Sequence, residues 1–213
     1  MGLPQFLFLI EGLKWTLALV AIAFVGGTVA GLSVALARTS GIRVLERATA
    51  GYIALFQGTP LLMQLFVVYY GLALAGLRLD AWVAVAAGFT LHASAYLGEI
   101  WRGSIEAVPW GQIEAARALN LRYLVRMRHV VMPQALRISM PATIGFLVQL
   151  LKGTSLAAIV GFTELTRAGS IVSNQIFEPL TVFAIVGALY FALCWPLSIW
   201  GTRIERRLAT ATR

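Results

Sequence analysis

The chemically most informative residues of this sequence are those that interrupt its long apolar runs. They are Gln57, Thr59, Pro60, Gln64, His92, Glu99, Lys152, Thr154 and Ser155. A polar group inside a membrane span is costly, and it usually faces an interior cavity. Pro60 and Gly153 also break the backbone, which leaves carbonyl and N–H groups free to meet a zwitterion. The pattern therefore predicts a path for a small polar solute. The alternative for each side chain is a hydrogen bond between helices.

A second informative group lies in segment 108–133, the longest polar and charged interval of the chain. Its candidate docking residues are Gly111, Gln112, Glu114, Ala115, Ala116, Arg117 and Asn120. Residues 112–119 predict a short helix, and Asn120 lies where it would end, since Asn tolerates the left-handed conformation that closes many helices. The alanines allow a partner backbone to approach closely. The alternative is a solvated helix that only connects two spans.

Several kinds of chemistry are excluded by what the sequence lacks. There is no G-x-x-x-x-G-K-[ST] loop, because neither Lys14 nor Lys152 is followed by Ser or Thr. The two histidines have no metal-site spacing, and Cys194 lies inside an apolar run, where a buried small side chain is expected. We therefore expect no catalytic residue, no metal and no cofactor bound by this chain, and we expect that it is not an enzyme.

The elements that position these residues are membrane spans. The chain of 213 residues is 59% apolar and only 12% charged, far from the composition of a soluble domain. Five runs approach the length that crosses the hydrocarbon core, and we expect spans at 15–37, 52–77, 81–100, 135–160 and 180–200. The first contains Gly27 and Gly31 at GxxxG spacing, so one face can pack closely on another helix. We expect an all-α fold, a single membrane domain over 1–213, and no removable signal peptide in residues 3–10.

Orientation follows from the 17 basic residues, which form no single nucleic-acid patch and, apart from Lys152 within a span, occupy the gaps between apolar runs. On one side lie 13 of them: Arg38, Arg43, Arg47, Arg102, Arg117, Arg122, Arg126, Arg128, Arg137, Arg203, Arg206, Arg207 and Arg213. Only Lys14, Arg78 and Arg167 lie on the other side. Because basic residues favour the cytoplasmic side, segment 108–133 and the C-terminus are expected in the cytoplasm and the N-terminus outside.

The sequence of segment 108–133 resembles the "EAA" signature of ABC-transporter permease subunits. That signature reads E-A-A, three residues, G, nine residues, I, one residue, L-P, and its spacing is kept in full from Glu114 to Pro133. Asn120 replaces Gly, Val130 replaces Ile and Met132 replaces Leu. The two apolar changes conserve volume, and Asn120 keeps the left-handed option. In this family the helix is the coupling helix that inserts into a cleft of the ATPase subunit.

Three further segments extend the resemblance to nearly the whole chain. Residues 56–62, FQGTPLL, are similar to the family's F-R-G-T-P-L-L, and 151–156, LKGTSL, to its L-K-D-T-S-L. Residues 164–169 match E-L-T-R-A-G. Together they point to polar-amino-acid uptake permeases of the histidine, glutamine or arginine type. With Gly153 in place of the usual acid, Lys152 loses its adjacent carboxylate, and we expect cationic amino acids to be disfavoured.

The resemblance implies a five-helix importer permease of the bacterial inner membrane. Its implied partners are two ATP-binding subunits, a second copy or a related permease, and an extracytoplasmic solute-binding protein. ATP and Mg²⁺ are then expected on the partner ATPase, and the solute is expected to be a polar amino acid. The alternative is an ion-coupled secondary transporter, which five spans without an internal inverted repeat fit poorly.

Overall fold

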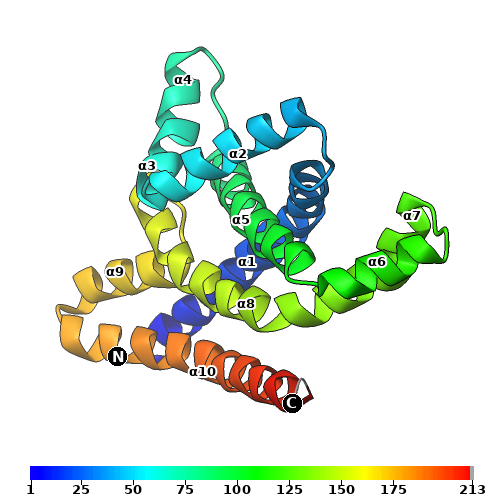
Figure 1. Cartoon of the computed structure of the whole chain (residues 1–213). Helices are drawn as coiled ribbons and strands as arrows, with labels where there is room; N and C mark the ends of the chain where they lie inside the picture. Colours follow the sequence, from blue (N-terminus) through cyan, green and yellow to red (C-terminus); the bar gives the residue numbers. More distant parts are fainter. Residues whose placement is uncertain (212–213) are drawn as a thin grey trace.

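The computed structural model describes the backbone of residues 1–211 and the side chains of 1–208, so Arg213 lies outside the described residues. The described part is helical throughout (Figure 1). Its α-helices are α1 (Leu3–Arg38), α2 (Arg43–Gly58), α3 (Leu61–Phe66), α4 (Leu72–Leu74), α5 (Ala81–Glu106), α6 (Trp110–Ala118), α7 (Tyr123–Arg126), α8 (Met132–Gly153), α9 (Leu165–Ile176) and α10 (Pro179–Ala211). The π-helical turns Val67–Gly71 and Met127–Val131 continue α3 into α4 and α7 into α8, and a 3₁₀ segment, Thr154–Val160, follows α8.

Within the described residues, four helical segments are long and apolar enough to cross a membrane. They are Leu3–Arg38, Ala81–Glu106, Tyr123–Val160 and Pro179–Leu208. The pair Arg43–Gly58 and Leu61–Leu74 becomes a fifth span if its bent halves are counted together. The halves meet at 106°. The bend lies at Thr59-Pro60, because Pro60 has no N–H to continue the helix and Thr59 is extended.

The helices extend beyond the apolar runs expected to cross the membrane. The first helix begins at Leu3, before the expected span at 15–37, so Lys14 lies inside it. A helix accepts this charge because Glu11 is one turn earlier, with 2.6 Å between Lys14 Nζ and Glu11 Oε2. The second helix begins at Arg43 and not at residue 52. The basic segment before it is helical too, because charged residues of an amphipathic turn remain outside the core.

The closest helix contact joins α1 to α5, and glycines of α1 make it possible. A Cβ on Gly27 would lie 2.5 Å from Ala93 Cβ, and one on Gly31 would lie 3.0 Å from the Ser94 carbonyl oxygen. Gly98 on α5 contributes to the same close contact, since a Cβ added there would lie 2.7 Å from Val34 Cγ1. The GxxxG face predicted for the first span is confirmed as a packing seam.

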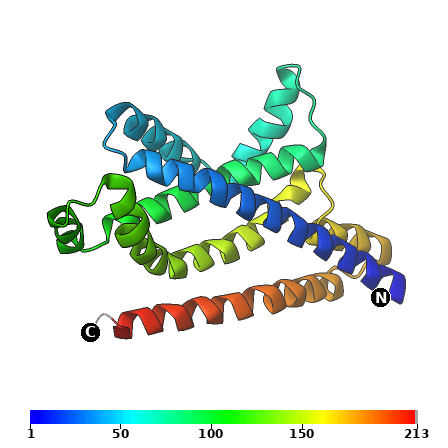
Figure 2. The ribbon, with the colours of Figure 1, turned by 90° about the vertical axis from the view of Figure 1, so that its right-hand side faces the viewer.

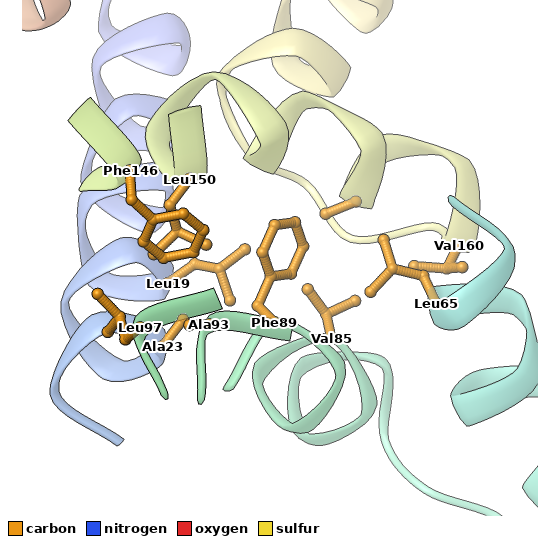
Figure 3. Packing of buried hydrophobic residues seen from close by; sticks show 11 residues of the cluster. Leu19, Ala23, Leu65, Val85, Phe89, Ala93, Leu97, Phe146, Leu150 and Val160 are labelled. Carbon is orange, nitrogen blue, oxygen red and sulfur yellow. The ribbon is translucent and has the colours of Figure 1, made fainter. Parts of the chain in front are cut away.

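The main apolar core lies where α1, α3, α5, α8 and the 3₁₀ segment meet (Figure 3). Phe89 of α5 is at its centre and is fully buried. Leu19 of α1, Leu65 of α3 and Leu150 of α8 belong to the same buried cluster. This core fixes the broken span against α5 and α8, and the candidate site described below lies at that junction.

The start of α9 is anchored between α1 and α10. Glu164 is fully buried and caps α9, accepting hydrogen bonds from the backbone N–H groups of Thr166 and Arg167, both at 2.8 Å. Tyr190 of α10 donates to the same carboxylate at 2.9 Å. Thr16 of α1 accepts from the Leu165 N–H at 3.1 Å. Figure 2 shows the N-terminus and α9 at one end of the molecule, and α6, α7 and the C-terminal end of α10 at the other.

Candidate functional site

A cavity of about 690 Å³ opens beside the break between α2 and α3. Six of the residues predicted to line a solute path meet in its wall: Gln57, Thr59, Pro60, His92, Lys152 and Ser155. Further side chains from α5 and α8 complete it, including those of Tyr96 and Gln149. The cavity therefore combines a broken backbone, one ammonium group and several neutral hydrogen-bonding groups, and none of the described residues in its wall carries a carboxylate.

The break that forms one wall is held by local hydrogen bonds. Thr59 Oγ1 donates to the Leu55 carbonyl at 2.7 Å. Gln64 Nε2 reaches back from α3 and donates to the carbonyls of Phe56 at 2.7 Å and Thr59 at 3.0 Å. These carbonyls come from the last turn of α2, where the helix leaves acceptors without partners. Gln64 thus replaces the hydrogen bonds that Pro60 interrupts.

Gln64 itself was predicted to lie on the solute path, and it is not in the wall of this cavity. It is 8% exposed, with its amide occupied by backbone groups and by His92. Its Oε1 lies 2.9 Å from His92 Nδ1. His92 is the residue of the pair that reaches the cavity. The interhelical hydrogen bond proposed as the alternative therefore describes Gln64.

The other wall is formed by the end of α8. Lys152 is exposed and makes no ion pair among the described residues. The adjacent Gly153 lets α3 approach, because a Cβ there would lie 3.3 Å from Leu61 Cδ2. Ser155 Oγ donates to the Lys152 carbonyl at 2.8 Å. Thr154 is fully buried, donates to the Leu151 carbonyl at 2.7 Å and is not in the cavity wall.

Glu99 is also absent from the cavity wall. It pairs with Arg102 on its own helix face, with 2.5 Å between Glu99 Oε1 and Arg102 Nη2. Arg102 also pairs with Glu106. The i, i+3 spacing had left this local pair open as the alternative, and the structure contains it.

The segment predicted to dock a partner contains the expected helix, now bounded as α6, Trp110–Ala118. Asn120 has φ 52°, as its left-handed role required. Its N–H donates to the Arg117 carbonyl at 2.8 Å, and the Leu121 N–H donates to the Ala116 carbonyl at 3.1 Å. This pair of bonds is a Schellman motif, which ends the helix sharply.

One side of α6 packs against the rest of the protein, and the other side is exposed. Ala116 is buried, and Ile113 packs against an apolar cluster of Ala35, Ile105, Val108, Val131 and Ala135. The remaining candidates are exposed: Gly111, Gln112, Glu114, Ala115, Arg117 and Asn120. Trp110 donates to Glu114 at 2.7 Å, and Arg117 stacks over the Trp110 ring at 5.2 Å. The short helix α6 therefore exposes Glu114, Ala115 and Arg117 together in a fixed arrangement.

Sequence reasoning missed two polar residues of the cavity wall, Tyr96 and Gln149. Helical spacing could have found both. Tyr96 lies four residues after His92 on α5, and Gln149 lies three residues before Lys152 on α8, so each shares a face with a residue already singled out. Among the described residues no group of three or more His, Cys, Asp or Glu side chains could hold a metal ion.

Comparison with known proteins gives consistent matches over almost the whole chain. Residues 27–210 match the family model described as "binding-protein-dependent transport system inner membrane component". The chain is 33% identical to the probable amino-acid ABC transporter permease protein YckA of Bacillus subtilis (strain 168), covering 98% of this chain and 92% of that protein. It is 32% identical to the arginine transport system permease protein ArtQ of the same organism, covering 97% and 94%.

A solved structure shares the fold. The chain superposes on a protein in a structure titled "Crystal structure of an amino acid ABC transporter with histidines" with a TM-score of 0.87. The two sequences are 34% identical, and the match covers 94% of each chain. The arrangement of the broken span, α5, α8 and α10 is therefore one that occurs in an experimentally determined transporter.

Proposed function

The chain belongs to the family of binding-protein-dependent transport system inner membrane components, and we propose that it lines the path by which an ATP-driven importer carries a polar amino acid inward. It is an inner-membrane transport subunit of an amino-acid ABC importer and not itself an ATPase. The observation that carries the proposal is α6, a fixed helix outside the spans that exposes Glu114 and Ala115. The cavity at the broken span supplies the path.

Membership of this family brings partners, an ATP-binding component and a solute-binding protein. We propose two ATP-binding subunits, a second copy of this chain or a related permease, and an extracytoplasmic solute-binding protein. ATP and Mg²⁺ belong to the ATP-binding subunits in this proposal. The chain's own contribution is a docking helix on one side and a polar cavity within the spans.

The proposed orientation puts α6 and the C-terminus in the cytoplasm and the N-terminus outside. Figure 2 supports it, because α6 and the C-terminal end of α10 lie at the same end of the molecule, opposite the N-terminus. Arg38 and Arg126 lie beside α6, because they line one cavity together with its Arg117. A cysteine introduced at Glu205, which is exposed near the C-terminal end of α10 and away from the docking helix, should react with an impermeant maleimide in inside-out vesicles and not in intact cells; labelling in intact cells would reverse the orientation.

The proposed mechanism transmits force through the seat of α6. When the ATP-binding subunits close, they move α6, and its apolar contacts through Ile113 and Ala116 pass the movement to α1, α5 and α8. Since packed helices shift as bodies between discrete arrangements, the cavity opens to one side of the membrane at a time. If α6 moved while the spans stayed in place, the apolar contacts between α6 and α1, α5 and α8 would have to break.

The proposed solute is a neutral or acidic amino acid. The cavity wall contains the ammonium of Lys152 and no carboxylate, so it complements a solute carboxylate and repels a second cation. Competition of uptake by arginine should therefore be much weaker than competition by glutamine or glutamate. Equal competition by arginine would contradict this assignment.

The decisive experiment purifies the tagged chain from its native membrane and reconstitutes the complex in vesicles. An ATP-binding protein should co-purify, and Glu114→Lys should abolish ATP-dependent uptake or assembly. Glu205→Lys is the matched control, because it reverses an exposed carboxylate at the same end of the molecule, away from α6. Normal uptake by Glu114→Lys, or uptake that needs no nucleotide, would reject the proposal, and the second result would favour an ion-coupled carrier.

A further inference from the structure

The amide of Gln64 has only one possible orientation. Its nitrogen contacts two backbone carbonyls, those of Phe56 and Thr59, and also lies 3.0 Å from Thr59 Oγ1. A carbonyl oxygen can only accept a hydrogen bond, so the amide N–H₂ must face this group of acceptors. The amide oxygen, Oε1, is therefore forced to face the opposite way, toward α5.

This orientation decides the protonation of His92. Gln64 Oε1 is an acceptor and lies 2.9 Å from His92 Nδ1, so Nδ1 must carry the hydrogen. The ring lies close to the aromatic rings of Tyr96 and Phe146, with centroids 4.5 and 6.2 Å away. A charged imidazolium is costly in this apolar setting. The neutral ring with a hydrogen on Nδ1 leaves a lone pair on Nε2.

The lone pair on Nε2 is available to the cavity. His92 forms part of the cavity wall, and Nε2 has no hydrogen-bond partner among the described residues. Among the described residues, Arg167 Nε is the one side-chain nitrogen or oxygen that is both fully buried and without a hydrogen-bond partner. His92 Nε2, which also has no partner, is therefore not fully buried, and a solute in the cavity can reach it. The remaining polar groups of the wall include the ammonium of Lys152 and the amide of Gln149.

We propose that Gln64 is a positioning residue that locks His92 in its Nδ1-protonated tautomer, so that the cavity carries a fixed acceptor that selects solutes bringing an uncharged side-chain N–H donor. The inference rests on the proposed function, because it places the cavity on the solute path. It narrows the solute class. Glutamine can bind its carboxylate near Lys152 and donate its amide to Nε2. Glutamate offers Nε2 a second carboxylate, which has no hydrogen to donate at neutral pH.

The first test reads the tautomer directly. The whole complex, with ¹⁵N-labelled histidine, is studied by NMR in lipid nanodiscs, and the His92 signals are identified by their loss in His92→Asn. Wild type should give the Nδ1–H pattern, and Gln64→Leu should give a mixture of tautomers. A dominant Nε2–H pattern in wild type, or an unchanged pattern in Gln64→Leu, would overturn the proposal whether or not the complex transports.

The second test measures equilibrium binding of radiolabelled glutamine and glutamate to the complex without its solute-binding protein, so that receptor specificity does not contribute. Wild type should prefer glutamine by about tenfold or more, as expected for one hydrogen bond made to a buried acceptor. His92→Asn keeps an amide donor for Gln64 but lacks the Nε2 acceptor, and it should lose the preference. Gln64→Leu should lose most of it.

Gln134→Leu is the matched control, because Gln134 also donates to a backbone carbonyl, that of Val130 at 2.8 Å, and is not in the cavity wall. It should keep the wild-type preference. Equal binding of both amino acids by wild type, or a preference retained in His92→Asn, would overturn the proposed selection. ATP-driven uptake by the same wild-type complex is measured separately, so failure of the proposed function is recognised independently.

Discussion

Of the small residues where α1 packs against α5, Gly27 should be the one that tolerates a larger side chain least. An added methyl at this position would lie 2.5 Å from Ala93 Cβ, 3.2 Å from the Ala93 carbonyl carbon and 3.3 Å from the Ser94 nitrogen. Carbon atoms in favourable contact are about 3.5–4.0 Å apart, so Gly27→Ala must move the helices apart by about 1 Å. A gap of that size forfeits about a quarter to a half of the attraction of each neighbouring contact.

Overpacking of this kind typically costs about 1–3 kcal/mol, which corresponds to a decrease of about 2–12 °C in the unfolding temperature of a chain of this size. The measurement is thermal unfolding of the purified complex in detergent. Gly187→Ala on α10 is the control, because its added methyl meets nothing within 4 Å and a mid-helix alanine is otherwise favoured over glycine. The control should be unchanged or more stable.

The double variant Gly27→Ala/Ala93→Gly makes the test sharper. It removes the partner of the 2.5 Å contact and leaves only the contacts at 3.2 and 3.3 Å, so it should recover most of the lost stability. Such recovery is the coupling expected of residues in direct contact. If Gly27→Ala unfolds at the temperature of wild type, or if the double variant is as unstable as the two single changes added together, the close approach of α1 and α5 is not what limits this position.

Three further predictions follow from single residues. Asn120→Val should destabilise the end of α6 by about 1–2 kcal/mol, because φ 52° is unfavourable for a β-branched residue, whereas Asn120→Gly should be tolerated; thermal unfolding of the two variants compares them. Burial raises the pKa of the Glu164 carboxyl above its usual 4.5, against donors at Thr166, Arg167 and Tyr190 that lower it. The folded chain then holds this proton more tightly than the unfolded chain, so the group's contribution to stability falls as pH rises through the folded pKa. The unfolding temperature of Glu164→Gln relative to wild type should therefore increase as pH rises above 4.5, and a difference that stays constant with pH would refute the argument. Lys152→Met should weaken binding of glutamine to the complex by about tenfold, measured with the radiolabelled amino acid, and unchanged affinity would remove Lys152 from the solute site.

The broken span shows where sequence pattern was sufficient and where it was not. Pro60 after Thr59 predicted the interruption, because the chemistry of proline is local. The direction of the interruption, a bend of 106°, depends on what fills its inner side. That filler is Gln64, whose amide bonds to groups five and eight residues earlier. The sequence identified Gln64 as a polar residue within a span. It could not tell whether the Gln64 side chain lines the cavity or hydrogen-bonds the end of α2, as it does in the structure.

The sequence by itself determined the apolar, span-forming character of the chain, the short helix that became α6 and the left-handed turn at Asn120, because apolar length, motif spacing and local backbone preference act over a few residues. It also identified polar residues of the cavity wall, among them His92, Lys152 and Ser155. Only the tertiary structure decided that Thr154 faces inward, that Glu99 pairs locally, and that Tyr96 and Gln149 join the wall. Which face of a helix meets a cavity depends on how that helix rotates against its neighbours, and this rotation is fixed by contacts between residues far apart in the chain, such as Gly27 with Ala93.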